Sequence, residues 1–110
     1  MIFSERLKQL PAVGALAGLR VWDAADQVVA VLENRPGQAG SVAVYHALAR
    51  LYGGCISPEA AALGLEWYGE HTAAARAQPG LHPNIDRLLA WSQGTASFRV
   101  ELLPAQAPPA

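Results

Sequence analysis

The sequence predicts an α+β fold: a small antiparallel sheet, made of a hairpin plus a C-terminal strand, covered by three main helices and preceded by a short N-terminal helix. Three patterns support this prediction. Two apolar runs, residues 19–23 and 28–32, flank a short turn, as in a β-hairpin. Longer segments between residues 41 and 77 carry apolar residues at helical spacing. Residues 98–102 alternate apolar and polar side chains, as a strand with one wet face does.

The N-terminal segment is expected to form a short amphipathic helix, because Phe3, Leu7 and Leu10 recur at helical spacing before a proline. The hairpin follows, with residues 24–27 as its turn. Residues 28–32 are apolar at every position and partly β-branched, which is typical of a well-buried strand. We therefore predict that this strand is more buried than the alternating strand at the C-terminus.

Three helices are expected between the hairpin and the last strand. Ser41 is a suitable N-cap for the first helix, which runs to about Tyr52 before a pair of glycines. Ser57, followed by a proline and a glutamate, starts the second helix, which runs to about Ala77. The third helix follows a Pro-Gly turn and is capped by Asn84.

The chain is interpreted as one globular domain over residues 1–103 and a tail over residues 104–110. With 110 residues, of which 52% are hydrophobic and 15% charged, the chain is long enough to bury one core. The tail is rich in proline and alanine, has little to bury and is expected to be disordered.

The composition excludes several classes of protein. A formal net charge of −1 gives no general attraction to nucleic acid or to anionic lipid. Cys55 is the single cysteine, which excludes an internal disulfide and a cysteine-based zinc site. No apolar run reaches the roughly 18 residues of a membrane span, and charges occupy the segment where a signal peptide is apolar. We therefore expect a cytoplasmic protein with neither a membrane nor a nucleic-acid partner.

The helical wheels predict that two histidines differ in burial. His71 falls on an apolar arc of the second helix, between Trp67 and Ala75, and is expected to be the more buried. His46 falls beside Arg50 on the opposite, wet face of the first helix and is expected to be the more exposed.

Polar residues on both sides of the Pro-Gly turn form the first candidate ligand site, which consists of His71, His82, Asn84 and Asp86. Two histidines and a carboxylate can bind a transition metal, but their spacing matches no standard metal motif. A histidine on an apolar face can act as a base, but no nucleophile with its own base and no cofactor fingerprint accompany it. We therefore expect no metal and no cofactor, and favour a non-enzymatic role over an enzymatic one.

The second candidate site would bind an anion at the start of the first main helix. Arg35 precedes a loop that leads through Gly40 into Ser41, where free N–H groups and the helix dipole favour negative charge. The loop is not a Walker motif, because no Gly-Lys-Ser or Gly-Lys-Thr closes it. The same residues are also typical of a connecting loop followed by a helix cap, and both interpretations stay open at this point.

Several segments together resemble a small family of uncharacterised bacterial proteins of about this length. These segments are Asn34-Arg35-Pro36-Gly37, Gly40-Ser41, residues 44–48, Glu70-His71-Thr72 and residues 82–87. The likeness covers nearly the whole chain and leaves out the tail. It implies a free-standing bacterial protein, and because the family has no assigned activity it implies no catalytic residue.

Two functions are compatible with these observations. The leading prediction is a non-enzymatic domain that binds a protein partner or forms a homodimer, because a three-stranded sheet has exposed edges and the chain has three tryptophans. The alternative is a protein, or a minor enzyme, that binds a small ligand or anion through the cluster around His71 and His82. A flat apolar face with Trp22 or Trp67 favours the first, and a pocket that joins the cluster to Arg35 favours the second.

Overall fold

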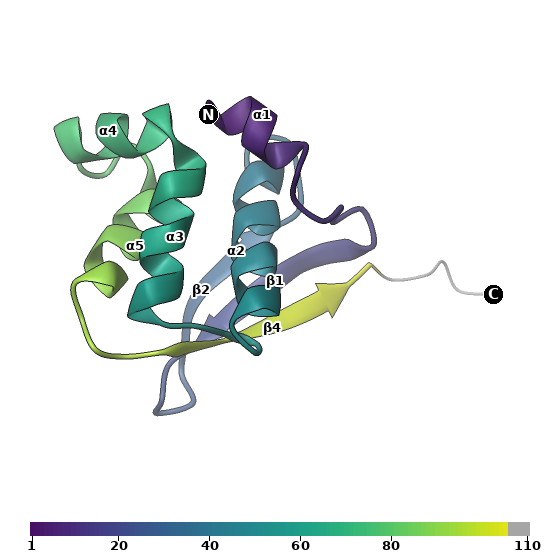
Figure 1. Ribbon diagram of the computed structural model, residues 1–110. Coiled ribbons are helices and arrows are strands. Elements are labelled where there is room, and N and C mark those ends of the chain that lie inside the picture. Colours follow the sequence, from purple (N-terminus) through teal and green to yellow (C-terminus); the bar gives the residue numbers. More distant parts are fainter. Residues whose placement is uncertain (106–110) are drawn as a thin grey trace.

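The computed structural model describes residues 1–105, which contain four strands and five helices (Figure 1). The strands are β1 (Leu16–Trp22), β2 (Val28–Glu33), β3 (Cys55–Ile56) and β4 (Phe98–Pro104). The helices are α1 (Phe3–Leu7), α2 (Ala39–Leu51), α3 (Pro58–Tyr68), α4 (Glu70–Ala77) and α5 (Pro83–Ser92). These elements confirm the α+β class and the short N-terminal helix. Of the tail predicted for residues 104–110, Pro104 belongs to β4, and residues 106–110 lie outside the described part.

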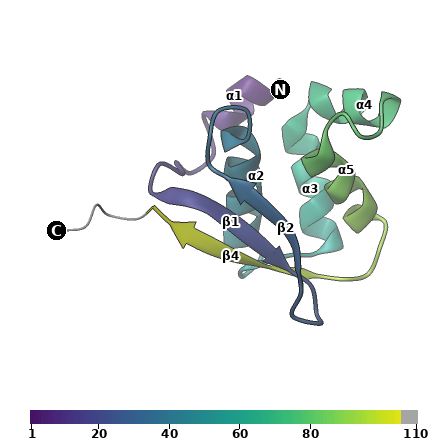
Figure 2. The ribbon, with the colours of Figure 1, turned by 180° about the vertical axis from the view of Figure 1, so that it is seen from behind.

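The strands form one antiparallel sheet in the order β2-β1-β4-β3, and the helices lie on one side of it (Figure 2). Leu19 of β1 is opposite Leu32 of β2 on one side and Leu102 of β4 on the other. The hairpin and the C-terminal strand were predicted to form the sheet, but their order was not. The short strand β3 pairs with the start of β4 and was not predicted. Two residues are too few to show the alternation that identifies a strand.

The hairpin strand β2 is an edge strand, and only one of its faces is buried. Ala30 and Leu32 are buried, whereas Val29 and Val31 are 42% and 55% exposed. The prediction of a well-buried strand is therefore wrong for Val29 and Val31, although β2 has two buried residues and β4 has none. The strand is apolar on both faces, but the helices cover only the inner one.

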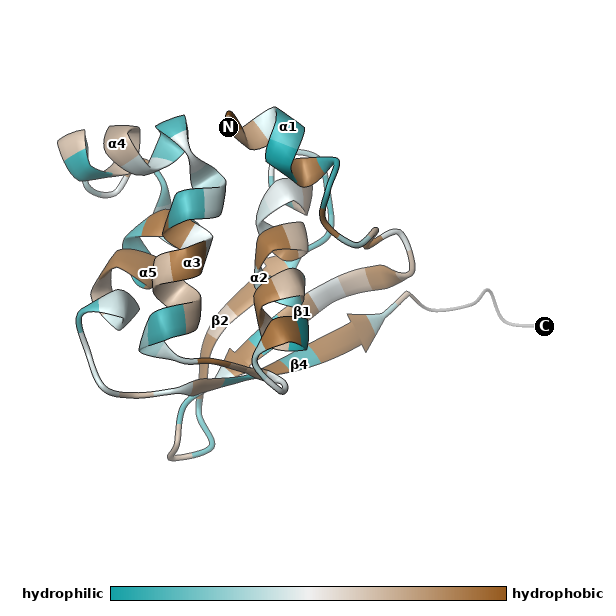
Figure 3. Ribbon diagram, in the orientation of Figure 1, coloured by the Kyte–Doolittle hydropathy of each residue, from teal (hydrophilic) through white to brown (hydrophobic). Residues whose placement is uncertain are grey.

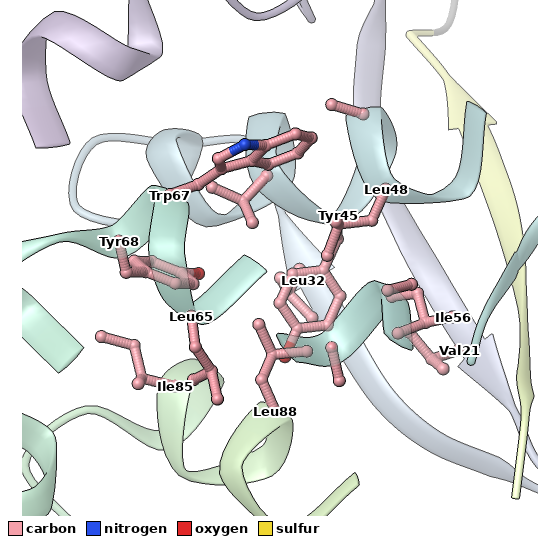
Figure 4. Close-up of a cluster of buried hydrophobic side chains, with 14 of the residues drawn as sticks. Val21, Leu32, Tyr45, Leu48, Ile56, Leu65, Trp67, Tyr68, Ile85 and Leu88 are labelled. Atoms are coloured by element: carbon pink, nitrogen blue, oxygen red, sulfur yellow. The ribbon is translucent and has the colours of Figure 1, made fainter. Parts of the chain in front are cut away.

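The core lies between the inner face of the sheet and the helices α2, α3 and α5, where apolar residues gather (Figure 3). Residues 42–49 of α2 are all buried, so this helix occupies the centre. Tyr45, Leu65 and Leu88 belong to the same buried cluster (Figure 4). Gly64 brings α3 close to its neighbours, because a Cβ there would lie 2.8 Å from side-chain atoms of both Leu48 and Leu88.

Two expectations about α2 are wrong. The helix begins at Ala39 without a side-chain cap, so the predicted cap, Ser41, lies inside its first turn. His46, predicted to be exposed, is only 9% exposed, because it belongs to the run of residues 42–49 that is buried throughout in the central helix α2. Burial, and to a smaller extent the charge of Arg50, lowers the pKa of His46 below its ordinary value.

The helix predicted to run from Ser57 to Ala77 is divided into α3 and α4 at Gly69. This glycine has φ 59° and ψ −122°, which residues with a side chain rarely adopt. A Cβ at Gly69 would also lie 3.0 Å from the carbonyl oxygen of Met1. The N-terminus of the chain therefore docks against the break, where it meets the first turn of α4.

Replacing Gly69 with alanine is expected to lower the free energy of unfolding by about 1 kcal/mol or more, because alanine must then adopt a positive φ. Urea unfolding of the two proteins measures the difference. Gly94→Ala is the matched control, because Gly94 has no positive φ and the nearest contacts of an added Cβ are at 3.8 Å. Equal losses of unfolding free energy in the two variants would show that the positive φ of Gly69 does not cause the effect.

Candidate functional site

An open cavity of about 610 Å³ lies where α1, the start of α2, α4 and the start of α5 meet. Its polar wall includes Ser41, Tyr68, His71, His82, Asn84 and Arg87. Its apolar wall includes Phe3, Leu7, Leu81 and Ile85. We call this space the histidine cavity.

The histidine cavity brings together residues from both candidate sites that the sequence predicted separately. His71, His82 and Asn84 of the first candidate line it together with Gly40 and Ser41 of the second. The first group comes from α4 and α5, and the second comes from the first turn of α2. One ligand in the cavity can therefore reach both groups.

Two other predicted residues, Asp86 and Arg35, do not line the cavity. Asp86 Oδ2 accepts a hydrogen bond from the amide of Gly80 at 2.8 Å and so holds the Pro-Gly turn. Arg35 forms an exposed ion pair with Glu33, at 3.5 Å. Each of these charged groups is engaged with a partner of its own.

The two histidine rings of the cavity are neighbours, with the centroids of His71 and His82 5.7 Å apart. Phe3 of α1 meets the His71 ring nearly at a right angle, at 5.4 Å, and stacks on Tyr68 at 5.0 Å. The helix α1 therefore forms one wall of the cavity and holds its aromatic side chains in contact.

The prediction that His71 is more buried than His46 is wrong, because His71 is half-buried and His46 is buried. The break at Gly69 explains the difference. It interrupts the helical phase, so that Thr72 and Ala75 are the buried residues of α4 while His71 lines the cavity.

Arg87 is the fixed cation of the histidine cavity. Its Nη1 donates to Asn84 Oδ1 at 2.9 Å and to Tyr45 Oη at 3.1 Å, and its guanidinium lies 6.0 Å from the centroid of the Tyr45 ring. Tyr45 Oη in turn donates to the carbonyl oxygen of Asn84 at 2.7 Å. Among the described residues, no carboxylate lies within ion-pair distance of Arg87. Its charge therefore has no neutralising partner there.

Two buried tyrosines support the polar wall from α2 and α3. Tyr68 Oη donates to Ser41 Oγ at 2.7 Å. Burial raises the pKa of Tyr45 to about 12, and the charge and hydrogen bond of Arg87 oppose part of this effect. Burial, and then the neighbouring Tyr45, raises the pKa of Tyr68 well above its ordinary value. Both hydroxyl groups therefore stay protonated near neutral pH and act as donors.

The backbone adds further donors at the starts of α2 and α5. In the described part of the chain, the amides of Gly40, Ser41 and Asn84 have no hydrogen-bond acceptor. Free amides at a helix start, together with the helix dipole, favour negative charge. No carboxylate of residues 1–105 lines the cavity, and the nearby Glu70 and Asp86 accept hydrogen bonds from backbone amides.

Sequence reasoning missed four residues of this site: Phe3, Tyr45, Tyr68 and Arg87. Aromatic residues at helical spacing are typical of apolar helix faces, and the sequence gives no sign that the hydroxyl groups of Tyr45 and Tyr68 meet polar partners. Arg87 was detectable, because it follows Asn84 by three positions in a helix and such side chains are neighbours.

The described residues contain neither a metal-binding cluster nor a membrane-spanning helix. No three His, Cys, Asp or Glu side chains of residues 1–105 gather as a metal ion requires. Over the same range, every helix is too short or too polar to cross a bilayer.

A hydrogen bond of 2.9 Å from the Phe3 amide to Glu70 Oε1 makes the attachment of α1 dependent on pH. This bond is the largest cause that holds the pKa of Glu70 below its ordinary value of 4.5. A carboxyl group whose pKa is lower in the folded state stabilises that state above the unfolded pKa. Its contribution is lost as the pH falls through the folded pKa.

We therefore expect the amide resonance of Phe3 to move as the pH falls below 4.5, in step with protonation of Glu70. An NMR titration measures this shift. Glu70→Gln should abolish it, whereas Glu66→Gln, one turn away on the exposed side of α3, should leave it unchanged. A Phe3 resonance that titrates equally in both variants would show that another group causes the shift.

The fold and the cavity define a small α+β protein with an open cavity whose polar wall carries an arginine, two histidines and free backbone amides. More specifically, the chain belongs to a family of uncharacterised proteins conserved in bacteria (DUF2322), whose family model matches residues 3–102. This confirms the resemblance noted in the sequence. No curated protein and no solved structure matches the chain.

Proposed function

We propose that this protein binds a small anionic molecule in the histidine cavity. The observation that carries the proposal is Arg87, a cation fixed by Asn84 and Tyr45 and without an acidic partner among the described residues. A guanidinium whose Nη1 is already held keeps its other N–H groups free for a ligand. The free amides of Gly40 and Ser41 add to the same preference for an anion.

The dimensions of the cavity are also compatible with a small ligand. A volume of about 610 Å³ falls within the range of roughly 300–1,000 Å³ that small-molecule sites occupy. The apolar wall formed by Phe3, Leu7 and Leu81 can bury the uncharged part of such a molecule, while the polar wall orients its charge.

The test compares Arg87→Gln with Arg76→Gln in calorimetric titrations with sulfate, phosphate, acetate and benzoate. Arg76 is an exposed residue of α4 and does not line the cavity, so the control removes the same charge nearby. We expect Arg87→Gln to weaken anion binding at least about tenfold and Arg76→Gln to change it little. If the wild type binds none of these anions, or if both variants bind equally well, the proposal is wrong. Circular dichroism verifies that the variants are folded.

A second function is supported by a separate observation, the exposed valines of β2. Val28 and Val29 are each 42% exposed on an edge strand, and unpaired edges are natural surfaces for another chain. We propose that this edge binds a protein partner or a second copy of the chain. Equilibrium sedimentation tests the second copy: the wild type should form a dimer that Val29→Lys dissociates and the exposed control Ala62→Lys does not. A wild type that stays monomeric would exclude self-association.

The compartment belongs to the same set of proposals. We propose the cytoplasm, because the chain has a single cysteine and needs no oxidising environment to form a disulfide. A net charge of −1 argues against nucleic acid as the partner of either surface. Fractionation of bacterial cells with an antibody to the protein measures its location.

A further inference from the structure

We infer that the anion bound in the histidine cavity is a phosphoryl group, and that His71 and His82 are among its ligands. The inference rests on the proposed anion-binding function and goes beyond it by naming the chemical class of the ligand. Inorganic phosphate and a phosphomonoester share this chemistry, and the apolar wall distinguishes them.

The positive charge of the site matches a dianion better than a carboxylate. Arg87 contributes one charge, and the N-termini of α2 and α5 contribute about half a charge each. The site therefore offers about two positive charges before either histidine is protonated. A phosphomonoester carries about −1.5 to −2 near pH 7, whereas a carboxylate carries one negative charge and would leave the site partly uncompensated.

The donors of the site also surround the cavity rather than lying in one plane. The amides of Gly40 and Ser41 come from α2, the amide of Asn84 and the Arg87 guanidinium come from α5, and the His71 ring comes from α4. A carboxylate has two oxygens in one plane. The three terminal oxygens of a phosphoryl group point in different directions and can accept from all three helices.

Ser41 completes this set of donors. Its Oγ accepts the hydrogen bond from Tyr68, so its own proton is free for another acceptor. Because the pKa of Tyr68 is raised by burial, that hydroxyl keeps its proton and the direction of the bond is fixed. The hydroxyl of Ser41 therefore acts as a donor to the ligand.

The histidine pair adds two imidazole rings to the donors of the site. Because the ring centroids are 5.7 Å apart, one phosphoryl group can contact both rings.

Within residues 1–105, no other charged or titratable group around the two histidines supplies the negative charge that the ligand would bring. The nearby acidic groups are Glu70 on α4 and Asp86 on α5, and each accepts a hydrogen bond from a backbone amide. The hydroxyl groups of Tyr68 on α3 and Tyr45 on α2 are uncharged near neutral pH, and Arg87 on α5 adds positive charge. The α-amino group of Met1 is the remaining charge and lies close enough to Glu70 to influence it.

The apolar wall selects the source of the phosphoryl group. Inorganic phosphate would leave Phe3, Leu7 and Leu81 exposed to water inside the cavity, whereas a phosphomonoester of an apolar or aromatic alcohol would cover them. The geometry therefore points to a small organic phosphomonoester.

The experiment records NMR spectra near pH 7 during titration with phenyl phosphate, inorganic phosphate and benzoate. We expect the two phosphates to shift the ring resonances of His71 and His82 and the amides of Gly40 and Ser41. The ring of His46, which does not line the cavity, is the internal control and should not move. Phenyl phosphate should bind about tenfold more tightly than inorganic phosphate, which has no aromatic ring for the apolar wall, and than benzoate, which has one charge and two oxygens for the polar wall.

A second arm tests His82 as a ligand. His82→Gln should weaken the binding of phenyl phosphate about threefold to tenfold, because the variant loses an imidazole that contacts the phosphoryl group. The matched control His46→Gln should leave this affinity unchanged. Because His82 is only partly buried, its variant is expected to fold, and circular dichroism verifies this.

The outcomes separate the inference from the function on which it rests. If benzoate binds the cavity as tightly as phenyl phosphate, or if His82→Gln binds phenyl phosphate as tightly as the wild type, the inference is wrong while anion binding stands. If inorganic phosphate binds as tightly as phenyl phosphate, the phosphoryl site stands and the organic group is excluded. If no anion shifts the resonances of the cavity, both the inference and the proposed function are wrong.

Discussion

Replacing Gly64 with valine is expected to lower the free energy of unfolding by about 3 kcal/mol, the upper part of the range for overpacked cores. Even the Cβ of the new side chain would lie 2.8 Å from Cδ1 of Leu48 on α2 and 2.8 Å from Cδ1 of Leu88 on α5. Both leucines are fully buried, so neither can turn away into solvent. The helix α3 must therefore move away from its two neighbours, and the packing of the whole helical layer becomes looser.

Urea unfolding measures this loss, with Ala62→Val as the matched control. Ala62 lies on the exposed side of the same helix, so valine there adds only the small cost of a β-branched residue, about 0.5 kcal/mol. Similar losses in the two variants would show that helix propensity, rather than close packing at Gly64, determines the effect.

Removing one oxygen atom by Tyr45→Phe is expected to affect both stability and ligand binding. The hydroxyl donates to the carbonyl oxygen of Asn84 and accepts from Arg87, so its loss leaves a partly buried carbonyl without this donor. We expect the free energy of unfolding to fall by about 1–2 kcal/mol. Because Arg87 then loses one of its two fixed contacts, we expect anion affinity to fall about threefold to tenfold in a protein that is still folded.

Tyr52→Phe is the control for this prediction. Tyr52 is 38% exposed at the end of α2, and its side chain makes no hydrogen bond within residues 1–105. Calorimetry with phenyl phosphate and urea unfolding should show no change for this variant. A Tyr45→Phe protein with full affinity would mean that Asn84 alone holds the guanidinium in place.

Most of the fold was predictable because its signals are local. The two apolar runs of the hairpin, the alternation in β4 and the helical spacing within α2 and α5 each lie within a dozen residues. The break at Gly69 was harder, because alanines on both sides continue the helical pattern and hide it. At the break the carbonyl oxygen of Met1 lies against Gly69, a contact between distant parts of the chain that no local pattern records.

The burial of β2 and His46 was mispredicted for the same physical reason. Periodicity shows which residues share a face, but it does not show which faces another element covers. Val29 and Val31 of β2 remain exposed, whereas residues 42–49 of α2, His46 included, are all buried.

The candidate site was predictable only in part. His71, His82 and Asn84 could be grouped because one short turn joins their helices. That Gly40 and Ser41 share a cavity with them depends on how α2 packs against α3, where Tyr68 reaches Ser41 across 27 positions of sequence. The sequence therefore indicated both groups of residues, but it did not show that the fold brings the two groups into one cavity.

The attachment of α1 also determines how a ligand reaches the cavity. This helix has five residues, none of them buried, and the bond between Phe3 and Glu70 joins positions 67 residues apart. Such a segment separates from the rest of a protein at a lower free energy than the core requires to unfold. Brief detachment of α1 would therefore open one wall of the cavity while the sheet and α2 stay intact. Hydrogen exchange at the amides of α1 should then be faster than in α2, and a bound ligand should slow it.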